Sequence, residues 1–330
     1  MALSKIPPAG HAQYVGARNL IINGAMQVAQ RGTSTASISS GNNFVLDRFR
    51  LQLTNGGTWT MSQSTTVPSG QGFSNSLKLD CTTADTSLGG DDLLQIQTLL
   101  ESQNFQHLAY GTSDAKTVTV SFWIRSNKTG TYTVELMHQT SSNTYPFTSK
   151  TFTISSADTW EKKEISYAGD TSADIINSNA VGYYVNIWLG AGSLRTSGTL
   201  SNGTWNLTKA NRVSSSNVNL ADSTSNELYL TGVQLEVGEQ ATPFEHRSFG
   251  DELARCQRYF YTTGADYGHG VFNANTYGHA SFPVTMRADP SITFLAGTSV
   301  TPTSVTINPT GFYAASTATQ GLQFNADAEL

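Results

Sequence analysis

The sequence predicts a mostly β protein, built around an antiparallel jelly-roll β-sandwich with one connecting helix and a small β-rich C-terminal domain. Three observations predict this fold class. Apolar and polar residues alternate along many short segments, turn residues separate these segments, and no helical patterns come between them. The composition agrees, because Ser, Thr, Asn and Gly suit strand surfaces and turns, whereas only 13% of residues are charged.

The alternating segments begin at Phe49, and the glycine-rich turn 55–57 is expected to lead from the first segment into the second. Segments 118–125 and 132–136, joined by the turn 127–130, are expected to pair as the clearest hairpin. The expected strands lie at 49–53, 59–61, 77–81, 94–100, 118–125, 132–136, 150–154, 160–167, 183–189 and 227–237.

The chain is expected to begin with an arm and to continue into the sandwich. Residues 1–18 contain paired prolines and little periodicity, which indicates an extended arm or a docking segment. The body of the sandwich is expected over residues 19–248. It opens with a short apolar strand at 19–24 that ends in an Asn-Gly turn signal.

One longer helix, over about 249–261, is expected to link the body to the C-terminal domain. Ser248 is placed to cap this helix, and Asp251 puts negative charge in its first turn. Its apolar face would carry Phe249, Leu253, Cys256 and Phe260. A shorter helical turn is expected near 102–108. Residues 262–330, with clustered glycines and short β patterns, are expected to form the small β-rich tip domain.

Charge and hydropathy disfavour several classes of function. The net charge of −5 offers no basic surface for a phosphate backbone, so nucleic-acid binding is not expected. No segment approaches the roughly 20 apolar residues of a membrane span, so membrane insertion is not expected. Residues 1–14 lack the apolar centre of a signal peptide, which predicts synthesis in a cytoplasm. The two cysteines, Cys81 and Cys256, are expected to be buried free thiols.

Several segments together resemble one family. The segment NLIINGAMQVAQRG at 19–32, followed by LDRF at 46–49, resembles the opening of many bacteriophage tail-fibre and minor virion proteins of the marine and cyanobacterial phage type. VSFWIRSNKTGTY at 120–132 is similar to the central hairpin of their jelly-roll module. GVQLEVG at 232–238 and LARCQRYF at 253–260 are similar to its closing strand and the helix that follows.

The resemblance implies a carbohydrate-binding-module-like jelly roll in a virion appendage, assembled as a homotrimer. The arm at 1–18 would attach the chain to other virion proteins, and the body would recognise host-surface polysaccharide. The protein would be made in the host cytoplasm and located in the virion. Because the sequence contains no coiled-coil heptads, a short spike or decoration is favoured over a long fibre.

Two other functions stay open beside host-surface glycan recognition. One alternative is an architectural head fibre, decoration or baseplate adaptor that binds no glycan. A polysaccharide depolymerase would need a catalytic pair or triad assembled by the fold. Because the sequence contains no nucleophile elbow or phosphate-binding loop, no enzymatic activity and no catalytic residue are expected.

Candidate glycan-binding residues lie on two of the expected strands. Sugar rings stack on flat aromatic side chains, while amides and charged groups bind their hydroxyls. Trp123 shares the non-core face of its strand with Arg125, and Trp188 shares the corresponding face with Tyr184 and Asn186. The two tryptophans are therefore predicted to form an exposed platform. The alternative is that a loop, a neighbouring subunit or the arm covers them, because tryptophan is more often buried than displayed.

Candidate metal-binding residues are carboxylates beside glycines. Asp91 and Asp92 follow Gly90, and Asp170 follows Gly169. Such carboxylates, together with backbone carbonyls, would suit one structural Ca²⁺. The alternative is that they are ordinary turn aspartates, since the spacing of an EF-hand loop is absent. No other cofactor is expected.

Overall fold

The computed structural model describes residues 18–264, 271–272, 276–295, 304–316, 320–321 and 323–330. The body strands are β1 Ser34–Phe44, β2 Phe49–Ser64, β3 Ser76–Thr83, β4 Leu93–Glu101, β5 Val118–Ser126, β6 Gly130–His138, β7 Phe147–Ile154, β8 Glu161–Tyr167, β9 Val181–Ala191 and β10 Glu227–Val237. Short helices in the described part of the body are η2 Ser102–Leu108, α1 Ser193–Thr196, η3 Lys209–Asn211 and η4 Leu220–Asp222. The predicted helical turn at 102–108 is therefore confirmed.

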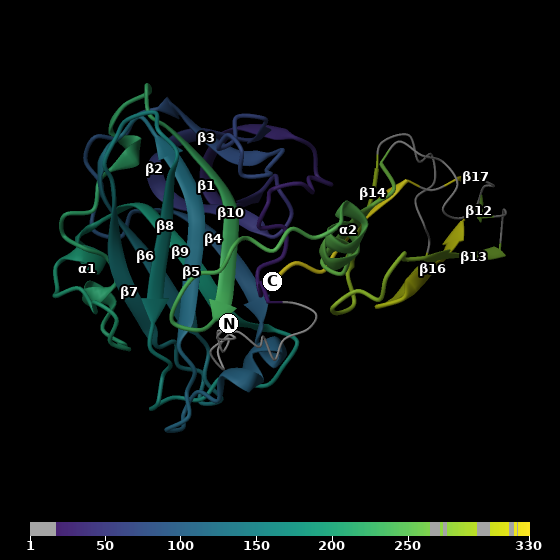
Figure 1. Ribbon diagram of the computed structural model, residues 1–330. Coiled ribbons are helices and arrows are strands. Elements are labelled where there is room, and N and C mark those ends of the chain that lie inside the picture. Colours follow the sequence, from purple (N-terminus) through teal and green to yellow (C-terminus); the bar gives the residue numbers. More distant parts are fainter. Residues whose placement is uncertain (1–17, 265–270, 273–275, 296–303, 317–319, 322) are drawn as a thin grey trace, which may run out of the picture.

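The body strands form one continuous sheet that folds into two layers, in the order β7-β6-β9-β4-β2-β3-β10-β5-β8. β2 belongs to both layers, because its residues 49–54 pair with β4 while residues 58–64 pair with β3; β1 pairs along both halves. Every pairing between these strands is antiparallel. The predicted mostly β, antiparallel sandwich is confirmed (Figure 1).

The glycine-rich segment within β2 is a bend and not a turn between two strands. Asn55, Gly56 and Gly57 all have positive φ values, of 46°, 126° and 79°. A Cβ atom on Gly57 would lie 2.3 Å from the carbonyl oxygen of Thr83, so the close approach of β3 also requires glycine there. The bend carries β2 from one layer into the other without breaking the strand, which corrects the predicted turn.

The predicted hairpin between β5 and β6 is wrong. β5 pairs with β8 and β10, whereas β6 pairs with β7 and β9 in the other layer. The turn after β5 thus carries the chain across the sandwich. The rings of Phe122 on β5 and Phe152 on β7 meet in the core with their centroids 5.2 Å apart. Alternation along a strand indicates which face is buried. It does not indicate which strand pairs with it.

The segment before β1 is not the predicted strand. Asn23 is fully buried in the left-handed conformation, and its side chain bonds the backbone of Val28 and Asp47. The backbone N–H of Leu20 donates to the carbonyl of Leu235, which attaches this segment to β10. The predicted arm at 1–18 lies outside the described residues apart from Arg18.

The connecting helix α2 extends over Phe249–Gln257 and so ends before the predicted residue 261. The predicted cap is confirmed, since the Ser248 side chain accepts a hydrogen bond from the N–H of Asp251. Phe249 is 56% exposed and Phe260 lies in a strand, so the predicted apolar face is wrong at both ends. Cys256 faces inward, and both cysteines are buried and free as predicted.

We call the region beyond α2 the tip. Its strands are β11 Phe260–Thr262, β12 Val271–Phe272, β13 Thr276–Ser281, β14 Ser291–Phe294, β15 Ser304–Asn308, β16 Gly311–Ser316, β17 Gln320–Gly321 and β18 Phe324–Asp327. Phe282, Phe312 and Phe324 centre a hydrophobic cluster that is separate from the core of the body. The predicted domain limits stay a prediction, since a side-chain cluster does not define where a domain folds independently.

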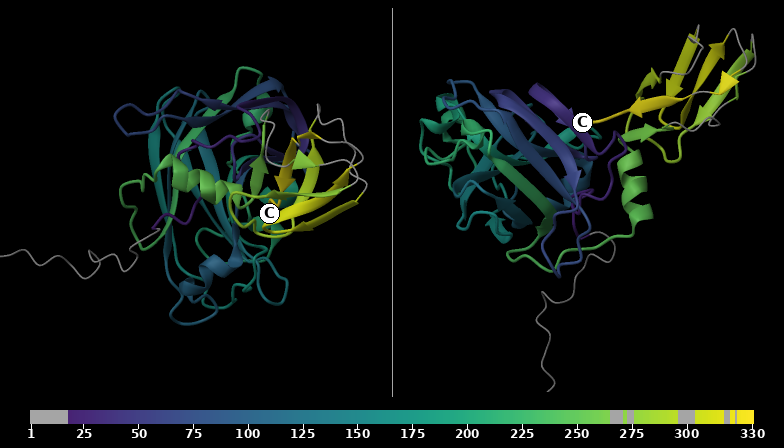
Figure 2. Two further views of the ribbon diagram at one scale, coloured as in Figure 1. Left: turned by 90° about the vertical axis from the view of Figure 1, so that its right-hand side faces the viewer. Right: turned by 90° about the horizontal axis from the view of Figure 1, so that it is seen from above.

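The end of the chain returns from the tip to the body (Figure 2). Glu329 forms ion pairs with Arg31 and with the fully buried Arg48. Nearby in the same joint, Arg258 donates to both carboxylate oxygens of Glu101, at 2.8 and 2.9 Å. Charged side chains therefore connect the two parts. No helix in the described part of the chain is long and apolar enough to span a membrane.

Candidate functional site

A groove of about 520 Å³ lies on the outer face of β5 and β10. We call it the Trp123 groove. The rings of Trp123, Phe73, Phe244 and His246 line it. The last three form a cluster with ring centroids 4.9 to 5.2 Å apart, in which Phe244 meets both Phe73 and His246 edge to face. Three sequence segments that are far apart thus contribute to one aromatic wall.

A bulge in β10 makes room for this wall. Thr231 pairs with Trp123 and Gln234 with Ser121, so two residues of β10 lie opposite one residue of β5, which leaves one extra residue in β10. Gly232, within the bulge, has a φ of 63°. A Cβ atom there would lie 2.6 Å from the ring of Phe73 and 3.1 Å from the ring of Trp123. The bare backbone of Gly232 therefore lets the two rings approach.

Polar side chains complete the Trp123 groove. Gln71, Ser121 and Lys162 line it beside the rings, and the Lys162 ammonium lies 2.6 Å from Glu164. Amide, hydroxyl and ammonium groups beside partly exposed rings are the groups that bind the hydroxyls and the apolar faces of a polar ring ligand. No Asp or Glu occurs among the described residues that line this groove.

The predicted platform of two tryptophans is wrong. Trp123 lies on β5 and Trp188 on β9, so the two residues face outward from opposite layers of the sandwich. Trp188 is fully buried and packs against Val213. The guanidinium groups of Arg195 and Arg212 lie 6.0 and 5.2 Å from the Trp188 ring. The connection between β9 and β10 therefore covers this face, which is the alternative that the sequence left open.

Asn186 is also buried, and its hydrogen bonds are used within the protein. Along one rung of the sheet, Arg50 donates to Gln97, and Gln97 donates to Asn186 at 2.6 Å. Asn186 donates in turn to Glu135 at 2.6 Å. Arg212 makes a bidentate contact with Glu135, at 2.8 and 2.6 Å. Asn186 is fully buried and both of its side-chain polar atoms bond within this network, so its predicted role is wrong in this structure.

The other two glycan candidates lie outside the Trp123 groove. Arg125 bonds Asp158 and places its guanidinium 5.0 Å from the centroid of Tyr229. Tyr184 is half-buried on the opposite layer, and burial raises its pKa to about 12. Roles for these two residues stay predictions. Among the five candidates, only Trp123 lines this groove.

Each candidate metal-binding carboxylate has a partner within the protein. Asp91 pairs with Lys209 at 2.9 Å, and Asp92 accepts a hydrogen bond from Asn55 at 2.8 Å. Asp170 lies 3.1 Å from the buried ring of His138. Across the described ranges, no group of three or more His, Cys, Asp or Glu side chains is arranged to hold a metal ion. A calcium role stays a prediction.

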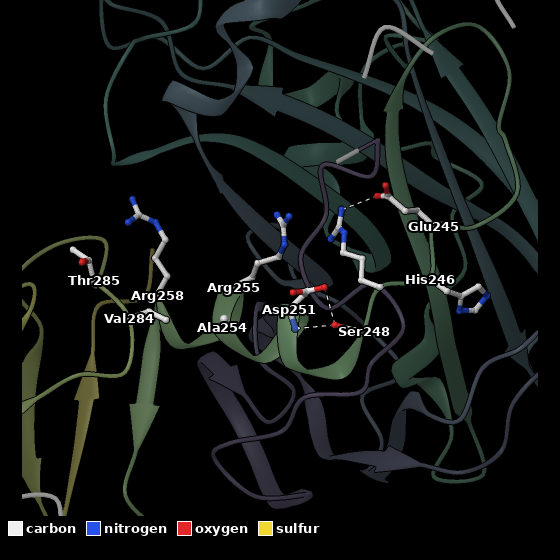
Figure 3. A pocket seen from close by; sticks show the side chains of 10 residues that line it. Glu245, His246, Ser248, Asp251, Ala254, Arg255, Arg258, Val284 and Thr285 are labelled. Carbon is white, nitrogen blue, oxygen red and sulfur yellow. Dashed lines mark hydrogen bonds and ion pairs between the residues drawn. The ribbon is translucent and has the colours of Figure 1, made fainter. Parts of the chain in front are cut away.

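A second groove, of about 580 Å³, lies along α2 and beside the first strands of the tip (Figure 3). We call it the α2 groove. Arg247, Arg255 and Arg258 line it, and the side chains of Arg255 and Arg258 extend from the helix in the same direction. Arg247 pairs with Glu245 at 3.0 Å, and Arg258 is held by Glu101. Sequence reasoning missed this groove, because its residues come from the body, the helix and the tip.

Comparisons with protein families and with curated proteins found no match for this sequence. Among solved structures, the enzymatically active domain of tailspike protein 4 from bacteriophage CBA120 is similar at 13% identity and a TM-score of 0.37. The alignment covers 67% of this chain and 22% of that one. The C-terminal family 22 carbohydrate-binding module of Clostridium thermocellum Xyn10B is similar at 14% identity and a TM-score of 0.33, over 64% of this chain and 98% of the module.

The xylan-binding domain CBM22-2 of Paenibacillus barcinonensis Xyn10C is similar at 15% identity and a TM-score of 0.31, over 62% of this chain and 98% of that domain. This chain spans less than a quarter of the tailspike chain. At these identities and scores, neither a ligand nor an activity transfers from these proteins to this one.

Proposed function

We propose that this chain is a non-enzymatic, glycan-binding structural protein of a bacteriophage particle, and that the Trp123 groove is its glycan site. The observation that carries the glycan role is the composition of the groove. A partly exposed indole lies beside three other rings and beside amide, hydroxyl and ammonium groups. Apolar ring faces and polar side chains in one open groove fit the two kinds of surface on a sugar.

The proposed location in a virion is supported by the segments at 19–32, 120–132 and 232–260 that resemble phage tail-fibre proteins. Assembly as a homotrimer would place three glycan grooves on one particle and multiply a weak affinity. Size measurement at micromolar concentration tests the trimer, which should have three times the 35.4 kDa mass of one chain. A stable monomer of 35.4 kDa would contradict it.

A binding role is favoured over a depolymerase. Glycoside hydrolysis commonly uses two carboxyl groups on either side of the scissile bond. The described lining of the Trp123 groove contains none. If the protein were nevertheless a depolymerase, incubation with host capsule or lipopolysaccharide would release new reducing ends. We expect none to form.

The test of the glycan role is Trp123→Ala, assayed by binding to purified host-surface polysaccharide. Loss of the stacking surface should weaken binding at least about tenfold, which corresponds to about 1.4 kcal/mol. Trp160→Ala is the matched control, because Trp160 is also a partly exposed tryptophan of this layer but does not line the groove. Equal binding by the two variants would refute the proposed site. If the protein is purely architectural, neither the unmodified protein nor either variant should bind polysaccharide.

A further inference from the structure

The Trp123 groove and the α2 groove meet at one residue. His246 lines both of them. On one side of it, Phe244 contributes its ring to the Trp123 groove, and on the other side Arg247 lines the α2 groove. The segment from β10 to α2 thus borders both grooves. A chain of sugars that leaves the Trp123 groove past His246 would enter the α2 groove.

Among the described residues that line the α2 groove, one cation has no counter-ion. Arg247 and Arg258 are held by carboxylates, whereas Arg255 makes no hydrogen bond or ion pair with any residue that the structure describes. Arg255 is half-buried and lines the groove. Asp251, one turn earlier on the same helix, is bonded to Ser248 at 2.7 Å.

A guanidinium group without a counter-ion in a partly buried groove favours an anion, because fewer waters surround it than at an open surface. The flanking arginines are already neutralised, so Arg255 is the group that an incoming carboxylate or phosphate would meet first. Arg255 also lies in the last turn of α2, where any cation stabilises the helix dipole. If Arg255 had only that role, its replacement would change the stability of the protein and would not change its preference among ligands.

We propose that the two grooves form one binding surface for an acidic glycan. A sugar ring stacks on Trp123, and an oxyanion carried by another sugar of the same chain pairs with Arg255. This inference rests on the proposed glycan role of the Trp123 groove and adds the class of glycan. The shared chemistry is an oxyanion, which a uronic acid or a phosphorylated sugar would supply.

The experiment measures the affinity of the full-length chain for a panel of uronic-acid and phosphorylated polysaccharides. Each is used in its native form, after reduction of its carboxyl groups to alcohols, and after removal of its phosphate. The variants are Arg255→Gln and Trp123→Ala. Lys116→Gln is the control, because Lys116 is exposed, lies outside both grooves and carries the same charge. The treatment that abolishes the preference identifies the oxyanion.

For the native acidic glycan, Arg255→Gln should weaken binding about tenfold. It should bind the form without the oxyanion as well as the unmodified protein does. Lys116→Gln should bind both forms normally, and Trp123→Ala should lose both. A thermal melt of Arg255→Gln separates loss of binding from loss of folding.

Three outcomes are decisive. If Arg255→Gln discriminates between native and treated glycan as the unmodified protein does, the anion site is refuted while the Trp123 site stands. If no acidic glycan of the panel binds better than its treated form, the inference is likewise overturned. If Trp123→Ala binds every glycan normally, the proposed glycan site is refuted. The inference is then refuted as well, because it rests on that site.

Discussion

At the scale of single residues, the candidate site depends on Gly232. Its positive φ and the closeness of two rings both require glycine. Trp123 was recognisable in the sequence as a residue on the non-core face of a strand. Its aromatic neighbours in the groove were not, because Phe73 and Phe244 lie 50 and more residues away along the chain. Contacts of that kind leave no local pattern.

Gly232→Ala should damage both stability and binding. The added methyl group would collide with the rings of Phe73 and Trp123, and alanine would be strained at a φ of 63°. Thermal unfolding should report a loss of about 1–3 kcal/mol, and glycan affinity should fall. Gly264→Ala is the control, since Gly264 has a φ of 59° but no atom within 4 Å of an added Cβ. Unchanged binding by Gly232→Ala would show that the rings need not be so close.

At the scale of elements, β2 shows how one strand can pair in both layers of the sandwich. Its apolar alternation was readable on both sides of the bend, and the glycines between them indicated a change of direction. The sequence did not distinguish a bend from a turn. Whether the segment is a bend or a turn depends on β1, which pairs along both halves of β2. Such a contact between strands leaves no pattern within β2 itself. β1 itself was not predicted, because its exposed Ser- and Asn-rich sequence has little alternation.

Gly57→Ala should destabilise the sandwich more than a comparable change elsewhere. A methyl group on Gly57 would lie 2.3 Å from the carbonyl oxygen of Thr83, and backbone atoms cannot move aside easily. Gly41 in β1 has nearly the same φ, 81° against 79°, with no atom within 4 Å. Alanine at either position should therefore lose about 1 kcal/mol of stability from the strained backbone conformation. Only Gly57→Ala should lose more, because of the steric clash. Urea unfolding of both variants measures the difference. Equal losses would contradict the steric explanation.

At the scale of the whole molecule, charged groups determine how the tip is attached. The Glu101 side chain is fully buried at the end of β4 and receives hydrogen bonds from Arg258 and Tyr259. Burial alone would raise the pKa of Glu101. The hydrogen bonds from these two residues and from Gln103, together with the positive charge of Arg258, outweigh burial, so its pKa lies below the ordinary value of 4.5. The carboxylate is therefore the form that the folded joint stabilises.

This joint should weaken in acid. Because the folded pKa of Glu101 is depressed, its contribution to stability is present above pH 4.5 and is lost as the pH falls through the folded value. Glu101→Gln should cost about 2 kcal/mol or more at neutral pH, and the gap to the unmodified protein should narrow on acidification. Thermal unfolding at a series of pH values measures this difference in stability. Small-angle scattering detects a tip that is no longer attached to the body. Glu239→Gln, at an exposed carboxylate, is the control. A gap that stays constant with pH would contradict this role.

The amino-acid sequence was sufficient for the local features of this protein. Alternation and turn residues indicated the strands of a β-sandwich, Ser248 indicated the start of α2, and Trp123 was correctly placed on the outer side of the core. These are properties of a few neighbouring residues, whose side chains point to alternate faces of a strand or one face of a helix.

The partners of those elements were decided only by the tertiary structure. β5 and β6 lie in opposite layers, Trp188 is covered by the connection between β9 and β10, and the aromatic wall of the Trp123 groove is assembled from three distant segments. Each outcome depends on which surfaces bury one another across long separations in the chain. A period of two along a strand cannot encode that choice, because every alternative pairing would present the same face to the core.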